Sequence, residues 1–219
     1  TRARRVNAEL EAVVDDLASM HDHVTGTARV GVIGTTARWL VPRLLVTMAE
    51  RHPGVRVIVT DATTSSLLLQ LSSGALDFAV VNLPVDDPEI STQPLFDEDA
   101  LIVVPSGHPL HDLDAAPLAA LDGVPLLVEP RGTAFRDHVD AQLQQAGITI
   151  VPQAEVDGMR LLATLAFEGF GAALLPASAA PVWASGDWKA LAVPELASRT
   201  VGLATRRRGQ LAAPARALL

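Results

Sequence analysis

Apolar positions near the start of the chain recur at alternating steps of four and three residues. They are Val6, Leu10, Val13, Leu17, Met20 and Val24, and charged side chains flank them. This 3.5-residue spacing is typical of the seam of a coiled coil. An isolated helix with so narrow an apolar stripe is marginal in water, so the stripe favours pairing with a second subunit over packing on its own chain. The pattern predicts a linker or dimerisation helix over residues 1–25, which Thr25-Gly26-Thr27 ends.

From residue 29 the pattern changes to short apolar runs that alternate with helix-like stretches. Strands are expected at 29–33, 55–60 and 76–81, and helices at 39–48 and 66–73. Pro42 falls near the expected start of the first helix, where its missing N–H costs least, and Gly74 fits the position just after the second. Strand, helix, strand, helix, strand predicts parallel pairing with right-handed crossovers.

A second series of the same kind follows a proline-containing loop at 84–94. Its strands are expected at 100–104, 126–129, 148–156 and 172–175, and its helices at 133–146 and 159–167. A last strand at 201–205 precedes a short helical tail. Two such units in tandem predict an α/β fold with two lobes.

The composition of the 219 residues narrows the class of protein. Hydrophobic residues make up 49% and charged residues 19%, which is typical of a globular chain. The net charge of −8 repels phosphate backbones, so these residues are not expected to grip nucleic acid by themselves. No apolar run approaches the roughly 18 residues of a membrane span, and the charged N-terminus lacks the apolar middle of a signal peptide. The lack of cysteine excludes disulfides and thiolate chemistry within these residues and fits a reducing compartment such as the cytoplasm.

Five stretches of the chain, taken in order, resemble the LysR-type transcriptional regulators. They are the linker-like helix that ends before GTARVGVIG, then WLVPRLLVTMAERHPGVRV, LLQLSSGALDFAVV, PLFDEDALIVVPSGHPL and EGFGAALLP. No single stretch is specific, because apolar strands and glycine turns are common. Their order and spacing across nearly the whole chain carry the resemblance.

The resemblance implies the fold of type II periplasmic binding proteins, in which two Rossmann-like subdomains are joined by two crossover strands. It implies subdomain I at 27–99 and 197–219 and subdomain II at 100–196, with crossings near 99–102 and 193–199. It also implies a small-molecule effector in a cleft between the lobes, self-association as a dimer or tetramer, and DNA reading by an N-terminal winged helix-turn-helix. Because the chain starts without Met and within the linker helix, we expect the winged helix-turn-helix to lie outside these 219 residues.

Polar loops that follow the expected strands supply the candidate effector contacts. In open α/β sheets, ligands sit beyond the carboxyl ends of the strands, where helix N-termini favour anions. The candidates are Thr35, Thr36, Thr64, Asn82, Arg131, Thr133 and Asp157, and the resemblance implies effector contacts at the four threonines. Each threonine could instead cap a helix without any ligand, and the arginine could be a solvated surface residue. The hydroxyls, helix N-termini and guanidinium fork together favour a small carboxylate.

Metal binding and catalysis have little support in the sequence. His108 and His111 fall in a loop, and His21 and His23 fall at a fraying helix end, so neither pair is expected to bind a metal. There is no Gly-x-Ser-x-Gly elbow, no P-loop lysine motif and no Gly-x-Gly-x-x-Gly after a strand. Carboxylates such as Glu129 lie near strand ends, but nothing pairs them with a nucleophile. We expect neither enzyme activity nor a cofactor.

The sequence therefore predicts the sensing and oligomerisation region of a LysR-type regulator. A small anionic metabolite bound between the lobes would favour one lobe arrangement by its difference in affinity for the two states. The alternative is a stand-alone solute-binding protein of a transporter, which shares the fold but does not need a heptad helix. A third possibility is an enzyme of the same architecture. The arginine run at 206–208 is expected at a solvated edge, where a partner subunit could also lie.

Overall fold

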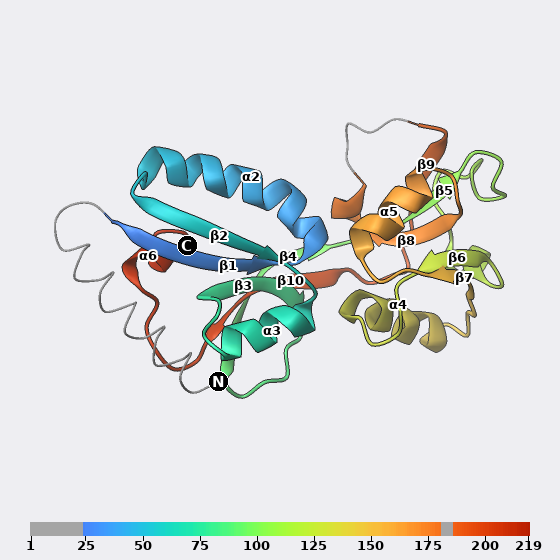
Figure 1. Ribbon diagram of the computed structural model, residues 1–219. Coiled ribbons are helices and arrows are strands. Elements are labelled where there is room, and N and C mark those ends of the chain that lie inside the picture. The colour runs from blue at the N-terminus through green and yellow to red at the C-terminus, as the bar shows by residue number, and fades with distance from the viewer. Residues whose placement is uncertain (1–23, 181–185) are drawn as a thin grey trace. The chain divides into compact units, whose positions relative to one another are not determined.

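The computed structural model describes residues 24–180 and 186–219 (Figure 1). The helix expected over residues 1–25 therefore lies outside the described residues, except for its last two positions. The chain divides into two compact units, Thr1–Phe96 with Val201–Leu219 as the first and Asp97–Thr200 as the second. The subdomain boundaries expected from the sequence stay predictions beside this division.

The first unit is built on a five-stranded sheet in the order β2-β1-β3-β10-β4. Its elements are β1 (Gly26–Val32), α2 (Gly34–Arg51), β2 (Val55–Asp61), α3 (Thr64–Ser72), β3 (Phe78–Leu83), β4 (Ile90–Glu98), β10 (Arg199–Arg206) and α6 (Ala213–Arg216). Strand β1 pairs in parallel with β2 on one side and β3 on the other. Right-handed crossovers from β1 to β2 and from β2 to β3 place α2 and α3 on opposite faces of the sheet, as Figure 1 shows.

The core of the first unit forms where the central strands meet the helices. Val30 and Val32 of β1 are buried with Leu67 and Leu71 of α3 in one hydrophobic cluster. Gly31 lies between these valines, and a Cβ there would stand 2.7 Å from side-chain carbons of Leu67 and Leu76. A side chain at this position would therefore force the Leu67 and Leu76 side chains to move, because both pack directly against the strand backbone.

Three expectations about the first unit are wrong. Gly26 and Thr27 open β1 instead of only ending a helix, so the strand begins earlier than expected. Helix α2 begins at Gly34, and Pro42 lies in its interior and removes one backbone hydrogen bond there. The expected loop at 84–94 ends early, because β4 starts at Ile90 and contains Pro94. Strand β4 lies at the edge of the sheet, where proline is tolerated.

The second unit repeats the same plan with a five-stranded sheet in the order β7-β6-β8-β5-β9. Its elements are β5 (Ala100–Pro105), the 3₁₀ turn η1 (Leu118–Leu121), β6 (Pro125–Val128), α4 (Ala134–Gln145), β7 (Val151–Glu155), α5 (Met159–Phe167), β8 (Ala172–Pro176), η2 (Ala177–Ala179) and β9 (Trp188–Ala192). Strand β6 pairs in parallel with β7 and β8, whereas β5 runs antiparallel to β8 and β9. The sheet is therefore mixed, with a parallel half that carries the two helices.

Strand β6, inside this sheet, is buried on both faces. Leu126 and Val128 belong to the cluster that contains Phe135 and Val139 of α4. Leu127, which points to the other face, belongs to a separate cluster with residues of α5. Strand β7 is shorter than the run expected at 148–156, and β9 has no counterpart among the strands expected from the sequence.

Candidate functional site

In the first unit, the candidate residues lie at one edge of the sheet, where the carboxyl ends of the parallel strands meet. Thr35 and Thr36 lie in the first turn of α2, directly after β1, and both side chains are buried. Thr64 begins α3 after β2, and Asn82 lies near the end of β3. The Asn82 backbone N–H donates to Thr64 Oγ1 at 3.1 Å, so the end of β3 and the start of α3 are in direct contact.

The residue before Thr64 shows which threonine caps the helix. Thr63 is the N-cap of α3, and its hydroxyl accepts a hydrogen bond from the Ser66 N–H at 3.4 Å. Neither α2 nor α3 carries an acidic residue in its first turn, so no side chain there neutralises the positive ends of the helix dipoles. This edge therefore favours an anionic group.

Two buried polar atoms at this edge have no hydrogen-bond partner among the described residues. They are Thr36 Oγ1, in a side chain that is 0% exposed, and Asn82 Oδ1. Such groups are rare in folded proteins, because each one costs roughly 1–3 kcal/mol when its partner is missing. A bound ligand would supply an acceptor or donor to the hydroxyl and a donor to the amide oxygen. We call Thr36, Thr64 and Asn82 the first-unit cluster.

In the second unit, Thr133 lies between β6 and α4 but does not act as an ordinary cap. It occupies the N-cap position of α4, yet its side chain accepts no capping hydrogen bond. Its hydroxyl instead has two acceptors in reach, Glu129 Oε2 at 3.3 Å and the Pro130 carbonyl at 3.0 Å. The Asp137 carboxylate ties the loop to the first turn of α4 by accepting from the Gly132 N–H at 2.9 Å. The side chain of Thr133 thus braces the loop from within.

Glu129 is the acidic centre of this loop. Burial raises the pKa of its carboxyl group above the ordinary value, and the neighbouring Asp157 carboxylate adds to the rise. The hydrogen bond from Thr133 and the positive charge of Arg199 act in the opposite direction. Asp157 is exposed in the loop between β7 and α5. We call Glu129, Thr133 and Asp157 the second-unit cluster.

The two arginines near this loop have different roles. Arg131 is exposed over 81% of its side chain, and its Nε lies 3.8 Å from Asp140 Oδ2. Arg136 is only 4% exposed, donates from Nε to Asp140 Oδ1 at 2.8 Å and from Nη1 to the Glu129 carbonyl at 2.7 Å. Arg136 therefore fixes the loop, while Arg131 remains available to solvent. The sequence analysis singled out Arg131 alone, although the i,i+4 spacing of Arg136 and Asp140 could have indicated the second contact.

A buried ion pair holds the strands that enter and leave the second unit. Arg199, at the start of β10, donates from Nε and Nη2 to Glu98 Oε2 at 2.9 and 2.5 Å. Arg199 also lies 5.4 Å from the centre of the Phe135 ring, and the Ser178 N–H donates to Glu98 Oε1 at 2.6 Å. The sequence analysis did not identify this pair, because its members lie 101 positions apart. No sequence signal marks such a contact without the fold.

The described residues offer no candidate metal site. Residues 24–180 and 186–219 contain no group of three His, Asp or Glu side chains that could hold a metal ion. The His108 ring accepts a hydrogen bond through Nδ1 from the Leu110 N–H at 3.2 Å, and burial lowers the pKa of this histidine. His111 lies 4.0 Å from the carboxylate of its neighbour Asp112. Each of these two histidines thus has a contact with a nearby residue of its own loop.

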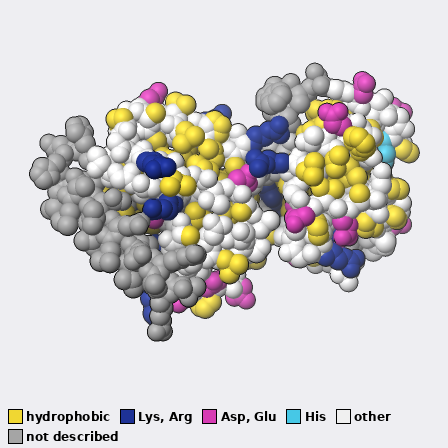
Figure 2. Space-filling model, viewed as in Figure 1, with side chains coloured by type: hydrophobic (Ala, Val, Ile, Leu, Met, Phe, Trp, Pro, Cys, Tyr) yellow, Lys and Arg dark blue, Asp and Glu magenta, His cyan; other side chains and the backbone are white. Residues whose placement is uncertain are grey.

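Hydrophobic side chains also lie on the surface of each unit. Figure 2 shows them gathered over α2 in the first unit and over α5 in the second. The exposed large residues include Leu45 and Val46 of α2 and Leu161 of α5. No helix of the described residues is both long and apolar enough to cross a bilayer. Exposed apolar patches of this kind are typical of surfaces that associate with other proteins.

The chain is similar to curated proteins that are named for induction by hydrogen peroxide. A "probable hydrogen peroxide-inducible genes activator" from Mycobacterium avium is 34% identical over 189 residues, which cover 84% of this chain and 59% of that protein. A cysteine mutant of OxyR from Corynebacterium glutamicum is 26% identical, with a TM-score of 0.79 over 95% of this chain and 66% of that one. The chain thus spans about three fifths of the length of the curated relatives it matches.

The fold has a further match in a ligand complex. The effector-binding domain of QuiR in complex with shikimate is 20% identical, with a TM-score of 0.81 over 89% of this chain and 93% of that one. Together these likenesses confirm the expected α/β fold with two subdomains of the type II periplasmic-binding-protein kind. The sequence profile described as the LysR substrate binding domain matches residues 21–219. The chain therefore belongs to the LysR substrate-binding domain family.

Proposed function

We propose that this chain is the sensing part of a DNA-binding transcriptional regulator and that it binds a small effector reversibly. Its family and the relatives named as gene activators support this role over that of an enzyme or a transporter's solute-binding protein. The whole regulator would work in the cytoplasm, self-associate and read its operator through a winged helix-turn-helix. The apolar side chains exposed on α2 and α5 support self-association.

The first-unit cluster carries the proposal about the effector. A ligand that satisfies Asn82 Oδ1 must donate a hydrogen bond, and one that lies at the N-termini of α2 and α3 is favoured when it is anionic. A small hydroxy acid has both properties, because its hydroxyl donates and its carboxylate accepts. This narrows the small anionic metabolite expected from the sequence to one chemical class.

The second unit would contribute charged and hydroxyl groups to recognition of the same effector. Arg131 is exposed and has only a long contact with Asp140, so its guanidinium can turn to a carboxylate. Thr133 can present its hydroxyl oxygen as an acceptor while its proton stays bonded to Glu129 or Pro130. Asp157 would accept from a hydroxyl of the ligand. If both units read one ligand, substitutions in either unit lower the affinity for that same ligand.

A thermal-shift screen tests the proposed ligand class on the 219-residue chain. Each hydroxy acid is compared with its deoxy acid, for example malate with succinate, because a ligand that binds only the folded state raises its melting temperature. We expect a stabilising hydroxy acid whose deoxy counterpart is weaker, with affinities then measured by calorimetry. Thr36→Val should abolish most of that binding, whereas Thr47→Val, at an exposed position on the same helix, should not. Equal binding by both variants would show that the cluster is not the site.

Peroxide sensing is a second candidate, because the relatives are named for induction by hydrogen peroxide. Peroxide sensors commonly oxidise a cysteine thiolate, and these 219 residues contain no cysteine. Within them, peroxide could therefore act only as a non-covalent ligand or through methionine. We expect peroxide to leave the mass and melting temperature of the chain unchanged under conditions where a hydroxy acid raises the melting temperature. A stabilisation by peroxide that Thr36→Val removes would favour this second candidate instead.

A further inference from the structure

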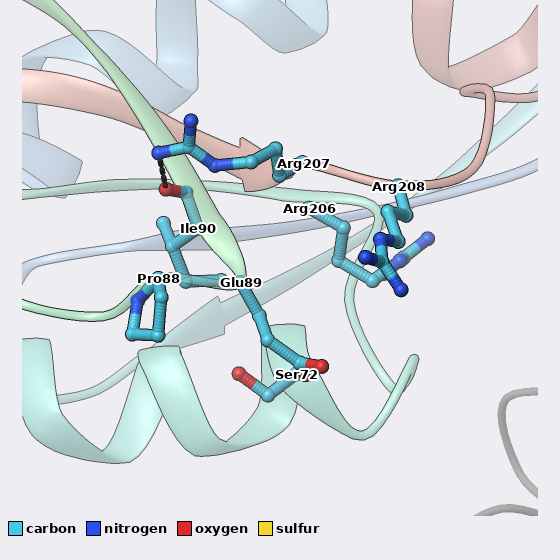
Figure 3. Close-up of a pocket in the computed structure, with 7 residues that line it drawn as sticks. All are labelled: Ser72, Pro88, Glu89, Ile90, Arg206, Arg207 and Arg208. Atoms are coloured by element: carbon cyan, nitrogen blue, oxygen red, sulfur yellow. Dashed lines mark hydrogen bonds between the residues drawn. The ribbon is translucent and has the colours of Figure 1, made fainter.

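The first unit contains a pocket that the proposed effector site does not use. It has a volume of about 200 Å³ and is lined by Ser72, Pro88, Glu89, Ile90, Arg206, Arg207 and Arg208. These residues come from the end of α3, the start of β4 with the loop before it, and the end of β10 (Figure 3). Three consecutive arginines thus contribute to one concave surface instead of only a solvated edge.

Hydrogen bonds to backbone carbonyls hold two of these arginines in place. Arg206 donates from Nη1 to the Leu71 carbonyl at 3.1 Å and to the Leu76 carbonyl at 2.6 Å. The Arg207 backbone N–H donates to the Glu89 carbonyl at 2.7 Å, and its Nη2 donates to the Ile90 carbonyl at 3.2 Å. Each side chain keeps further N–H groups beyond those used in these bonds. The pocket therefore presents positioned donors, not freely moving side chains.

A structural role explains only part of this arrangement. Arg206 satisfies a carbonyl at the C-terminal end of α3, where a positive charge is favourable. That role needs one arginine and gives no reason for Arg208, whose side chain lies on the same side of the pocket as that of Arg206 in Figure 3. The lining carries three arginines and one glutamate, and therefore a formal charge of +2. A positive pocket on a chain of net charge −8 is suited to an anion.

We propose that this arginine pocket binds a phosphate-type oxyanion, either inorganic phosphate or the phosphoryl group of a small metabolite. The side chains of Arg206 and Arg208 lie together in Figure 3, whereas the Arg207 guanidinium lies on the other side, at the Ile90 carbonyl. A tetrahedral oxyanion presents oxygens in several directions, so it can accept from both Arg206 and Arg208. The volume is below the roughly 300–1,000 Å³ of pockets for drug-sized ligands, so the occupant is small. Glu89 and the C-terminal end of α3 oppose the anion, and the affinity is therefore modest.

The arginine pocket lies at the other end of α3 from the first-unit cluster. Thr64 begins this helix at the proposed effector site, and Ser72 ends it at the pocket. Nine residues of helix separate the two ends by about 12 Å at 1.5 Å per residue. The proposal does not depend on the proposed function, because it rests on other side chains and another ligand class.

Calorimetric titration of the 219-residue chain with inorganic phosphate, at low chloride concentration, tests the proposal. We expect phosphate to bind, and Arg208→Ala to weaken it by about tenfold or more, since a charged hydrogen bond contributes roughly that factor. Arg208→Lys should retain part of the binding, because it keeps the charge but loses the fork. Arg43→Ala removes the same charge from an exposed position of α2 and should leave phosphate binding unchanged.

Further measurements distinguish inorganic phosphate from a phosphorylated metabolite, and both from duplex DNA, as the ligand of the pocket. Tighter binding of a phosphate monoester than of inorganic phosphate assigns a metabolite, and the reverse order assigns the free ion; both support the pocket. Equal phosphate affinity in the wild type and Arg208→Ala overturns the proposal. Binding of duplex DNA through Arg208, without binding of phosphate or of a monoester, also overturns it. Circular dichroism of each variant checks that the chain remains folded.

Discussion

The two units share one plan but place different chemistry at the carboxyl ends of their parallel strands. In each sheet the three mutually parallel strands, numbered along the chain, lie in the order second, first, third, with a helix on either face. In the first unit, buried hydroxyl and amide groups lie at the carboxyl ends of these strands, and two of their atoms have no hydrogen-bond partner among the described residues. In the second unit, these positions hold Glu129, Asp157 and a hydroxyl that is already engaged.

This difference indicates that the polar groups of the first unit are suited to bind a ligand, whereas those of the second unit mainly fix loops. Unsatisfied buried groups weaken a fold unless a ligand completes them, so the first-unit cluster has the properties of a binding surface. In the second unit, Arg136 and Thr133 form hydrogen bonds within the loop after β6. The Glu98–Arg199 pair joins the end of β4 to the start of β10. There the polar groups mainly hold their own loops. The substitutions below test that contrast, in order of decreasing expected effect.

The largest effect is expected when the buried ion pair of the second unit loses one partner. Arg199→Met leaves the Glu98 carboxylate buried without its charge partner, because both side chains are only about 6% exposed. We expect the free energy of unfolding to fall by about 3–5 kcal/mol, as measured by urea denaturation. The double variant Glu98→Gln with Arg199→Met removes both charges and should recover part of this loss. If Arg199→Met costs no more than an exposed control such as Arg43→Met, the pair does not stabilise the unit.

The same substitution should act with opposite sign in the two units. Thr36→Val removes a buried hydroxyl that has no partner among the described residues, so we expect the ligand-free chain to gain about 1 kcal/mol of stability. Thr133→Val removes a hydroxyl bonded within the loop after β6, so we expect a loss of about 1 kcal/mol. Thermal unfolding of both variants, beside Thr47→Val, measures the difference. Two shifts of the same sign would remove the contrast between the units.

The fold was predictable to the extent that apolar periodicity reflects burial. Strands β1, β3, β6 and β8 lie inside the two sheets, are largely buried and give the short apolar runs that predicted them. The outer strands β2 and β7 are more exposed. Strand β4 was missed because it lies at a sheet edge, is largely exposed and contains Pro94. The start of α2 was placed too late, since Gly34 and the threonines that follow it resemble a loop more than a helix. Edges and helix starts lack the signal that burial gives.

The candidate site was predictable only as a set of positions. The rule that ligands lie beyond strand ends identified Thr36, Thr64 and Asn82, which lie at the starts of α2 and α3 and near the end of β3. It could not show that Thr36 has no partner while Thr133 has two, because hydrogen bonding depends on geometry between loops. The role of Arg199 was likewise invisible, since burial of an arginine runs against its usual exposure. Only the i,i+4 spacing of Arg136 and Asp140 gave a signal for the other buried arginine.

The pH dependence of stability should distinguish the charged cluster of the second unit. The pKa of Glu129 is raised in the folded chain, so above the ordinary glutamate value of 4.5 the folded chain holds this proton more tightly than the unfolded chain. The contribution of Glu129 to stability is therefore full at lower pH and is lost as the pH rises through the folded pKa. Glu129→Gln should flatten this part of the curve, and Glu168→Gln, at an exposed position, should not. Unfolding free energies measured across this pH range contradict the assignment if the two variants behave alike.

The smallest effect on stability is expected at Arg131, although it is the candidate of the second unit most open to a ligand. Its side chain is 81% exposed and its contact with Asp140 is 3.8 Å long, so Arg131→Ala should change the free energy of unfolding by less than about 0.5 kcal/mol. Its effect on the affinity for a hydroxy acid should be larger than its effect on stability, because a guanidinium that is not committed to the fold can pair with a carboxylate. Arg136→Ala should show the reverse, with stability lost through the loop after β6. If Arg131→Ala leaves the affinity for the effector unchanged while Thr36→Val abolishes binding, recognition belongs to the first unit alone.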